Sequence, residues 1–224
     1  MTEPFFNPYA TEQVSPPYSE HWQAKRRLAQ AIRELTEVLV TSAPSVAEMD
    51  SISERLELQA RQLAESTRLY GLMAFIRDGN HGQHAELNHE LNSVGGWSNP
   101  LAPGLNMWFE DGVAHGRVSL GYAYEGPPEH LHGGHVAALF DQFMGMTQIL
   151  AKHPGMTARL NIRYQRPTPL NTELVLRAEL VSENHPKTVV KATISAHGKV
   201  TATGEALFVR PSRRNPAVRK MSLD

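Results

Sequence analysis

The sequence predicts an α+β fold in which one antiparallel sheet wraps around one central helix, with a helical extension before it. Two observations support this prediction. An unusually apolar run of helical length, from about 135 to 152, follows a strand region over 113–124. Four segments with strand-like alternation then follow one another with no further helix between them. Strands, one buried helix and consecutive strands form an α+β order, so we expect the sheet to cover the helix.

Composition excludes several classes of protein. The 224 residues suggest one or two domains with a core that is stable without disulfides, and the net charge of −1 gives no broad field for nucleic acid. The chain has no cysteine, which excludes thiolate nucleophiles and thiolate zinc sites and fits the cytoplasm. No apolar run reaches membrane-spanning length, and the first residues lack a signal-peptide pattern. We expect a cytoplasmic protein without nucleic-acid or membrane partners.

The N-terminal part predicts two amphipathic helices. The first extends over 19–42; the second begins after the capping-box pair Ser45 and Glu48 and extends to about 76. A short proline-containing link joins them, so we expect an αα-hairpin whose apolar faces pack on another surface. These faces consist of Leu28, Ile32, Leu35 and Leu39 in the first helix and Met49, Ile52, Leu56, Ala60 and Leu63 in the second.

Glycine and proline gather in one long connection, which divides the chain. After it, the strands that follow the central helix are expected over 156–164, 173–182, 188–196 and 200–209, the last two joined by a hairpin turn. The predicted organisation is an extended arm over 1–18, a helical hairpin over 19–76, a linker over 77–104, a sheet domain over 105–212 and a C-terminal tail over 213–224.

The central helix carries the most informative residues. It opens with His132-Gly133-Gly134 and contains Asp141 within an otherwise apolar stretch. A helix that is apolar on nearly every side is a buried helix, and a carboxylate inside it is costly unless it is paired, hydrogen-bonded or shifted in pKa. The first N–H groups of a helix have no partner within it, so they can polarise a carbonyl and stabilise an oxyanion. We therefore regard Asp141 as a catalytic candidate.

One helix cannot easily bring both groups to one carbonyl. Asp141 lies seven residues beyond Gly134, or about 10 Å along the axis, whereas reacting groups must converge within roughly 3 Å. A second copy of the helix, antiparallel across a two-fold axis, can supply the missing group. We therefore expect a composite site at a dimer interface, with Gly133 or Gly134 from one chain and Asp141 from the other.

At these residues the chain resembles a known family, the hotdog-fold acyl-CoA thioesterases of the PaaI-like and thioesterase-superfamily-member branch. The motif is His132-Gly133-Gly134 followed nine residues later by Asp141, and then a strand in which Thr157 begins the pattern Thr-x-x-Leu-x-Ile-x-Tyr-x-Arg-Pro in family members. The resemblance covers about 104–210 and implies a hotdog fold, a homodimer or homotetramer, and hydrolysis of an acyl-CoA thioester without metal or other cofactor. It does not explain the helical extension.

The resemblance also implies roles for single residues. Asp141 matches the catalytic carboxylate, as general base or as nucleophile, and Gly133 matches the oxyanion donor. His132 matches the histidine that shapes the turn, and Thr157 matches a hydroxyl that orients the attacking water in some members. Some relatives carry an asparagine six residues before this histidine, where this chain has Gly126. Each residue also has a structural interpretation: a satisfied buried acid, a tight turn, a backbone-bonded histidine and a strand-forming threonine.

Other polar residues have weaker interpretations. Arg159 and Arg163 share one face of a strand, where they can bind CoA phosphates or simply form a solvated outer face, which the pattern favours; Gly134 allows close approach of substrate. Two groups of histidines have the composition of a metal site, but neither has a fixed ligand geometry, so we expect no metal. The two groups are His130, His132 and His135, and His81, His84 and His89.

Two rival functions remain open at this point. A hotdog hydratase or dehydratase needs an Asp/His pair on the acyl chain, which His132 and His135 do not clearly supply. A non-catalytic acyl-CoA-binding or scaffolding protein would bind acyl-CoA without releasing thiol. The acyl group itself depends on the lining of a tunnel that the sequence does not reveal.

Overall fold

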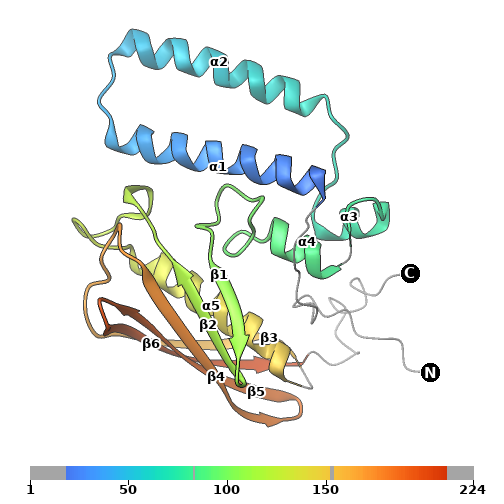
Figure 1. Cartoon of the computed structure of the whole chain (residues 1–224), viewed down its shortest axis with the longest axis vertical. Helices are drawn as coiled ribbons and strands as arrows, with labels where there is room; N and C mark the ends of the chain where they lie inside the picture. Colours follow the sequence, from blue (N-terminus) through green and yellow to red (C-terminus); the bar gives the residue numbers. More distant parts are fainter. Residues whose placement is uncertain (1–18, 83, 152–153, 211–224) are drawn as a thin grey trace.

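The structure is a computed structural model that describes residues 19–82, 84–151 and 154–210 (Figure 1). The predicted arm over 1–18 and the tail over 213–224 lie outside the described residues. In chain order the elements are α1 (Glu20–Thr41), α2 (Val46–Ala64), α3 (Leu72–Asp78), α4 (His84–Leu91), β1 (Asn106–Glu110), β2 (Val113–Val118), the 3₁₀ turn η1 (Tyr122–Tyr124), α5 (Gly133–Thr147), the 3₁₀ turn η2 (Gln148–Leu150), β3 (Met156–Tyr164), β4 (Leu174–Asn184), β5 (Lys187–Ala196) and β6 (Lys199–Val209).

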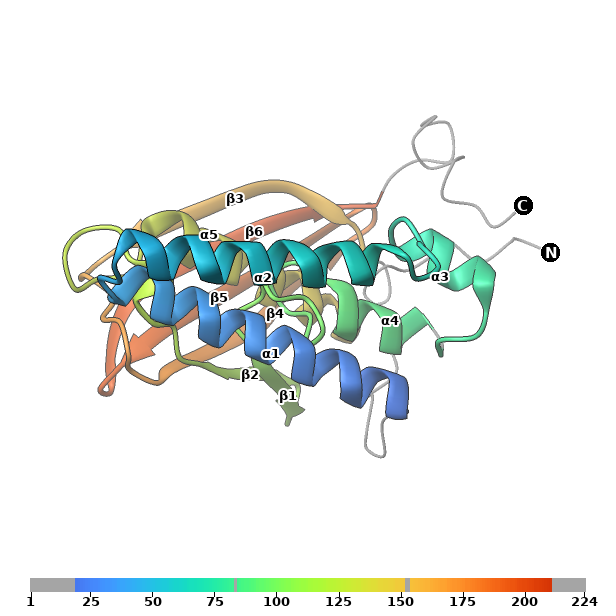
Figure 2. The ribbon, with the colours of Figure 1, turned by 90° about the horizontal axis from the view of Figure 1, so that it is seen from above.

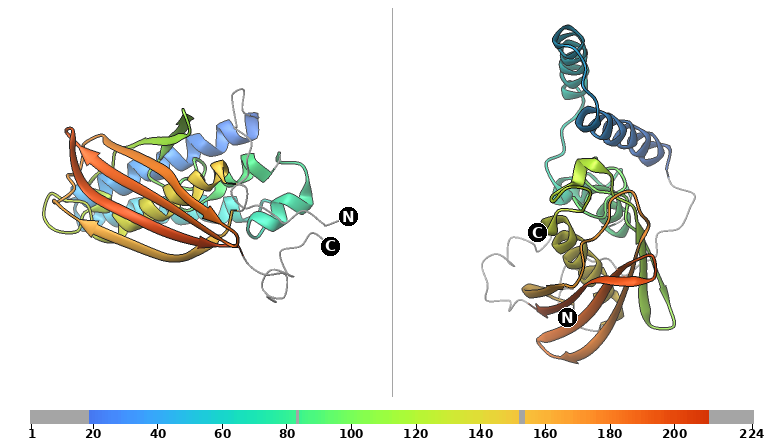
Figure 3. Two further views of the ribbon diagram at one scale, coloured as in Figure 1. Left: turned by 90° about the horizontal axis from the view of Figure 1, so that it is seen from below. Right: turned by 90° about the vertical axis from the view of Figure 1, so that its left-hand side faces the viewer.

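The strands form one antiparallel sheet of six strands in the order β1-β2-β4-β5-β6-β3. Consecutive strands β4, β5 and β6 pair as hairpins. The chain after β2 passes through α5 to β3, which forms the edge of the sheet opposite to β1. The sheet curves around α5, as the two views in Figure 3 show. The predicted α+β fold, with one antiparallel sheet around one helix, is confirmed.

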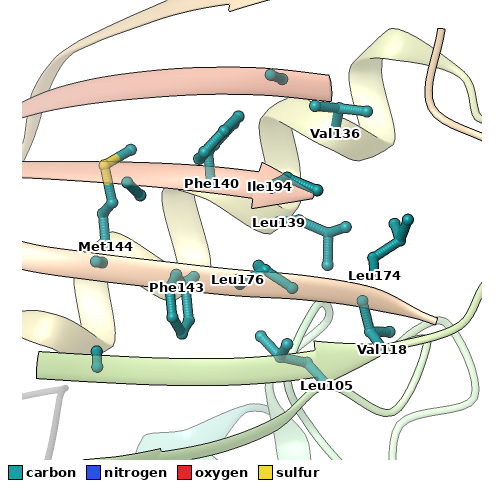
Figure 4. Packing of buried hydrophobic residues seen from close by; sticks show 14 of the residues in the cluster. Leu105, Val118, Val136, Leu139, Phe140, Phe143, Met144, Leu174, Leu176 and Ile194 are labelled. Atoms are coloured by element: carbon teal, nitrogen blue, oxygen red, sulfur yellow. The ribbon is translucent and has the colours of Figure 1, made fainter. Parts of the chain in front are cut away.

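Close contact between α5 and the sheet forms the core (Figure 4). Phe140 and Phe143 of α5 are fully buried and press against glycines in the strands. A Cβ atom at Gly204 of β6 would lie 2.9 Å from the Phe140 ring, and one at Gly116 of β2 would lie 2.9 Å from the Phe143 ring. Glycine is therefore required at both positions, because any side chain there would push α5 away from the sheet.

The N-terminal helices differ from the prediction in length. The second predicted helix, over 45–76, ends at Ala64 in the structure, and α3 begins only at Leu72. Gly71 lies between them with a φ of 80°, which breaks a continuous helix. The predicted linker over 77–104 contains α4, which the prediction missed because the glycines and prolines on both sides of it indicated a loop. No helix among the described residues has both the length and the low polarity needed to cross a bilayer.

The apolar faces of the predicted hairpin do not pack as expected. Leu39 of α1 is 61% exposed and Leu56 of α2 is 45% exposed, and the other large side chains of both predicted faces are exposed as well. No residue of α2 is buried, and α2 lies beyond α1, away from the sheet (Figure 1). Seen from above, α2 crosses over the sheet domain without joining it (Figure 2). The opposite side of α1 makes its contacts, beginning with the fully buried Trp22. Periodicity correctly found both helices, but their contacts depend on residues outside the apolar stripes.

Polar contacts fix α1 to the rest of the chain at three points. Near its start, Arg26 forms a bidentate pair with the fully buried carboxylate of Glu90 in α4. In its middle, the Arg33 guanidinium donates to the carbonyl of Asn99, with Nη1–O 3.1 Å. Towards its end, the Glu37 carboxylate accepts the N–H groups of Tyr122 and Ala123, at 2.8 and 2.9 Å. These three contacts hold α1 in a defined position against the rest of the chain.

Candidate functional site

The start of α5 distinguishes the two glycines of the motif. His132 caps the helix, because its Nδ1 accepts the N–H of Gly134 at 3.0 Å. Nδ1 must then lack a proton, so the neutral ring carries its proton on Nε2. Among the described residues, no hydrogen bond engages the N–H of Gly133. The free donor at this helix start is therefore the Gly133 amide, whereas the Gly134 N–H is already used by the cap.

Contacts from two sides hold this turn in place. The Tyr164 hydroxyl, at the end of β3, donates to the Gly133 carbonyl at 2.9 Å. On the other side, a Cβ atom at Gly126 would lie 2.6 Å from the Cα of His132. The asparagine that some relatives carry at this position would collide with the turn, so this chain cannot use such an amide without moving the helix start.

Asp141 is exposed in the single chain, which corrects the expectation of a buried carboxylate. The sheet covers only one side of α5, and Asp141 lies on the open side with Gly134 and Ala138. Oδ1 of Asp141 accepts a hydrogen bond from the Thr157 hydroxyl at 2.8 Å, which orients the carboxylate, and within the described residues no hydrogen bond engages Oδ2.

An irregularity in β3 makes the contact between Thr157 and Asp141 possible. Simple alternation would place Thr157 on the face of Arg159, away from α5. The pairing with β6 shifts between these two residues: Thr157 faces Phe208, and Arg159 faces Leu207. The extra residue, Ala158, inverts the alternation and turns Thr157 towards the helix.

A cavity of about 720 Å³ lies beside the open side of α5 that carries Gly134, Ala138 and Asp141. α1, the segment over 93–103 and η1 form its walls, and α5 contributes His135, Ala138 and Leu139. Burial, and secondarily the neighbouring His132, lowers the pKa of His135, so its ring is neutral at neutral pH. Asp141 does not line this cavity. Ala138, which does, lies one helical turn before Asp141 on the same side of α5.

Comparisons with known proteins agree with this geometry. Residues 129–215 match the family model described as "Thioesterase superfamily". The crystal structure of the thioesterase superfamily protein RHA08564 is 32% identical and superposes with a TM-score of 0.71, covering 87% of this chain and 97% of that one. The chain belongs to the thioesterase superfamily. Its hotdog fold, predicted from the motif, is confirmed.

Likeness to the thioesterase RHA08564 extends into the helical region, because a coverage of 87% cannot be confined to the sheet domain. Two mammalian thioesterases match over shorter segments. Acyl-coenzyme A thioesterase THEM4 of Mus musculus is 33% identical over 113 residues, which are 48% of this chain and 49% of that protein. THEM5 of Homo sapiens is 39% identical over 56 residues, 25% of this chain and 23% of that protein. The chain thus spans about half the length of the mouse relative, or less for the human one.

The remaining predicted site residues of this thioesterase-family chain lie apart from Asp141. Arg159 and Arg163 are exposed on the face of β3 that points away from α5. His130 bonds to the Pro128 carbonyl through Nδ1 at 2.8 Å, and the ring of His135 contacts that of Tyr124. The side chain of His84 lies outside the described set. Within the described residues, no three metal-binding side chains gather around one point.

The sequence pattern missed Tyr164 as a site residue. Alternation over 156–164 puts Tyr164 on the same face as Leu160 and Ile162, but nothing in that pattern indicates that its hydroxyl reaches the carbonyl of Gly133.

Proposed function

We propose that this protein hydrolyses the thioester of an acyl-CoA to a free acid and CoA. The observation that carries the proposal is that α5 presents two groups of the required kind. One is the N–H of Gly133, which has no partner among the described residues, and the other is the exposed Asp141 carboxylate, which Thr157 orients. A donor for an oxyanion and a base for water are the two elements that acyl transfer to water needs. Family membership and the names of the mammalian relatives support the same chemistry.

In the proposed reaction, Asp141 removes a proton from water as the water oxygen attacks the thioester carbon. The carbonyl oxygen becomes an oxyanion and accepts the Gly133 N–H. The intermediate collapses, the C–S bond breaks, and CoA leaves as a thiolate that takes up a proton. We assign the base role to Asp141 because Thr157 occupies Oδ1 and leaves Oδ2 for water; direct attack by Asp141 is the alternative. Thr157 is then a positioning residue.

The distance between Gly133 and Asp141 within one chain supports a site formed by two protomers. Gly133 and Asp141 are eight residues apart on one helix, about 12 Å along its axis. On the open side of α5 between them, Gly134, Ala137 and Ala138 are small and at least partly exposed, and the exposed His135 lies towards the cavity, so a second α5 can approach closely at the small residues. A two-fold axis beside Ala138 would bring Asp141 of the partner subunit to the start of α5.

The outer edge of β3 supports the same arrangement. β3 is nine residues long and is exposed along most of its length, and among the residues that the structure describes it pairs only with β6. Long exposed edge strands are normally covered, because their free N–H and C=O groups recruit other strands. Since β3 flanks the open side of α5 that carries Asp141, one partner subunit can cover both surfaces.

Four further residues keep supporting roles in this proposal. His132 maintains the helix start, and its Nε2–H is available to the substrate. Gly134 permits close approach of the thioester. Arg159 and Arg163 remain predictions for CoA phosphates, which would reach them only from the far face of β3.

A thiol-release assay over short, long and aromatic acyl-CoAs tests the proposed function. The wild-type protein should release free CoA, and Asp141→Asn should lower kcat by about 10²–10⁴-fold. Asn keeps the size of the side chain and can still accept the Thr157 hydroxyl, so circular dichroism and the melting temperature should not change. Wild-type turnover in the Asp141→Asn protein would contradict the role of Asp141. Tight acyl-CoA binding by the wild type without thiol release would instead indicate a binding protein.

A further inference from the structure

The cavity beside α5 lies where the acyl part of the proposed substrate would extend. His135 lines the cavity and lies two residues after Gly133, which is about 3 Å along the helix axis. A carbonyl bound to the Gly133 amide would thus be within one helical turn of the cavity mouth. Its volume of about 720 Å³ falls within the usual range of about 300–1,000 Å³ for small-molecule sites.

The polar side chains that α1 contributes to this cavity already have hydrogen-bond partners. Gln30 donates to Glu34 at 2.9 Å and accepts from Arg33 at 3.1 Å. Arg33 also bonds to the carbonyls of the 93–103 segment, and the Thr36 hydroxyl donates to the carbonyl of Ile32. Glu37 accepts two backbone N–H groups of η1. None of these side chains needs a polar ligand to complete its bonding.

The rest of the lining is mostly apolar. Val94 and Leu101 contribute from the loop, Leu120 and Ala123 from the segment around η1, and Leu139 from α5. Tyr124 adds a ring whose hydroxyl bonds to the Leu101 carbonyl at 3.4 Å, and burial raises the pKa of that hydroxyl. A hydrocarbon chain gains free energy from burial against such walls. Ser93, Ser119, His135 and Asn171 are the polar residues of this part of the lining.

We infer that α1 and the 93–103 segment, which lie outside the sheet domain, form the acyl pocket of this protein and set its preference for hydrocarbon chains of medium or greater length. This inference rests on the proposed function. It gives the N-terminal extension a role: α1 is anchored by Arg26, Arg33 and Glu37 so that the wall stays in position. Each methylene that enters the pocket should lower Kd about four-fold until the pocket is filled.

The test narrows the pocket from two walls. Thr36→Trp fills it from α1, and Ala123→Phe fills it from η1; Leu39→Trp places the same indole on α1 outside the lining and serves as the matched control. Binding of acetyl-, hexanoyl-, decanoyl- and palmitoyl-CoA is measured by calorimetry in the Asp141→Asn background, and kcat/KM is measured with Asp141 intact.

We expect both narrowing variants to lose at least ten-fold in affinity and kcat/KM for palmitoyl-CoA while changing acetyl-CoA less than two-fold, and Leu39→Trp to follow the wild type at every length. Equal losses at all lengths, or no loss, in a folded narrowing variant would overturn the inference, as would a wild-type Kd independent of chain length. The experiment distinguishes failure of one proposal from failure of the other. If Kd falls with acyl chain length but no thiol is released, the proposed hydrolysis is wrong and the acyl pocket is supported. If thiol is released but Kd does not depend on chain length, hydrolysis is supported and the acyl pocket is wrong.

Discussion

α1 and α2 have similar amphipathic patterns but opposite relations to the rest of the molecule. α1 buries Trp22 and Ala29 and forms ion-pair and backbone contacts with three separate segments, whereas α2 buries nothing. Their apolar stripes do not explain the difference, because both stripes are exposed. What distinguishes α1 is a set of residues on its other face that match groups far away in the sequence. The comparison shows that a few long-range contacts, those of the buried Trp22 and of the polar residues Arg26, Arg33 and Glu37, distinguish the anchored helix better than hydrophobic periodicity does.

The largest effect should come from Trp22, the deepest anchor of α1. Trp22→Ala removes a fully buried indole and should lower the free energy of unfolding by about 3–5 kcal/mol, as measured by urea denaturation. Trp22→Phe keeps most of the ring but loses the bond from Nε1 to the His81 carbonyl, so it should cost only about 1 kcal/mol. If the alanine variant were as stable as wild type, α1 would not be part of the folded unit.

A smaller effect is expected from the pair between Arg26 and Glu90, which has an exposed counterpart on α2. Glu90→Gln leaves the Arg26 guanidinium without its charge partner and should cost about 2 kcal/mol, because one end of the pair is fully buried and the other can reach water. Glu57→Gln removes the exposed pair with Arg61 on α2 and should leave the urea midpoint unchanged. Equal effects of the two substitutions would mean that the contrast between the helices is false.

The smallest effect is predicted for the apolar face of α2. Leu56→Ala should change the free energy of unfolding by no more than about 0.5 kcal/mol, because Leu56 is already 45% exposed. Leu87→Ala, in the fully buried face of α4, is the control and should cost about 2–5 kcal/mol. A loss at Leu56 that approached the loss at Leu87 would show that another surface covers α2 in solution.

Local patterns predicted the sheet domain better than the extension. β3 was predicted with its observed limits, 156–164, because strict alternation is bounded by a glycine before it and a proline after it. The α5 motif also follows from short-range spacing, whereas a role for Thr157 came only from the resemblance to the thioesterase family. The extra residue at Ala158 does not follow from such spacing, because a β-bulge depends on the register of the neighbouring strand rather than on the alternation itself.

Local patterns also cannot predict the contacts of α1, because these contacts join residues that are far apart in the sequence. Arg26 and Glu90 are 64 residues apart, and nothing in either local sequence indicates the other. The exposure of Asp141 was also missed, because an apolar sequence does not reveal that the sheet covers only one side of α5. Small residues such as Ala137 and Ala138 count as apolar in a pattern, yet they can form an open surface.

The composite site is tested most directly by complementation between two inactive variants. Asp141→Asn lacks the base. Gly133→Pro lacks the free N–H, and it should keep the helix because proline is tolerated at the first helical position and His132 already has the extended backbone that precedes proline, with φ −60° and ψ 132°. Gly133→Ala is the control, since it keeps the N–H and places its Cβ 3.5 Å from Tyr164, an ordinary contact.

When the two inactive chains are co-expressed, half of the dimers should be mixed, and each mixed dimer has one site with an intact Gly133 and an intact Asp141 from different chains. The account predicts thiol release at about one quarter of the wild-type rate, although each variant alone is inactive. Mixed assemblies that are as inactive as their parents, with exchange of subunits verified by mass spectrometry, would contradict it and place both groups in one chain.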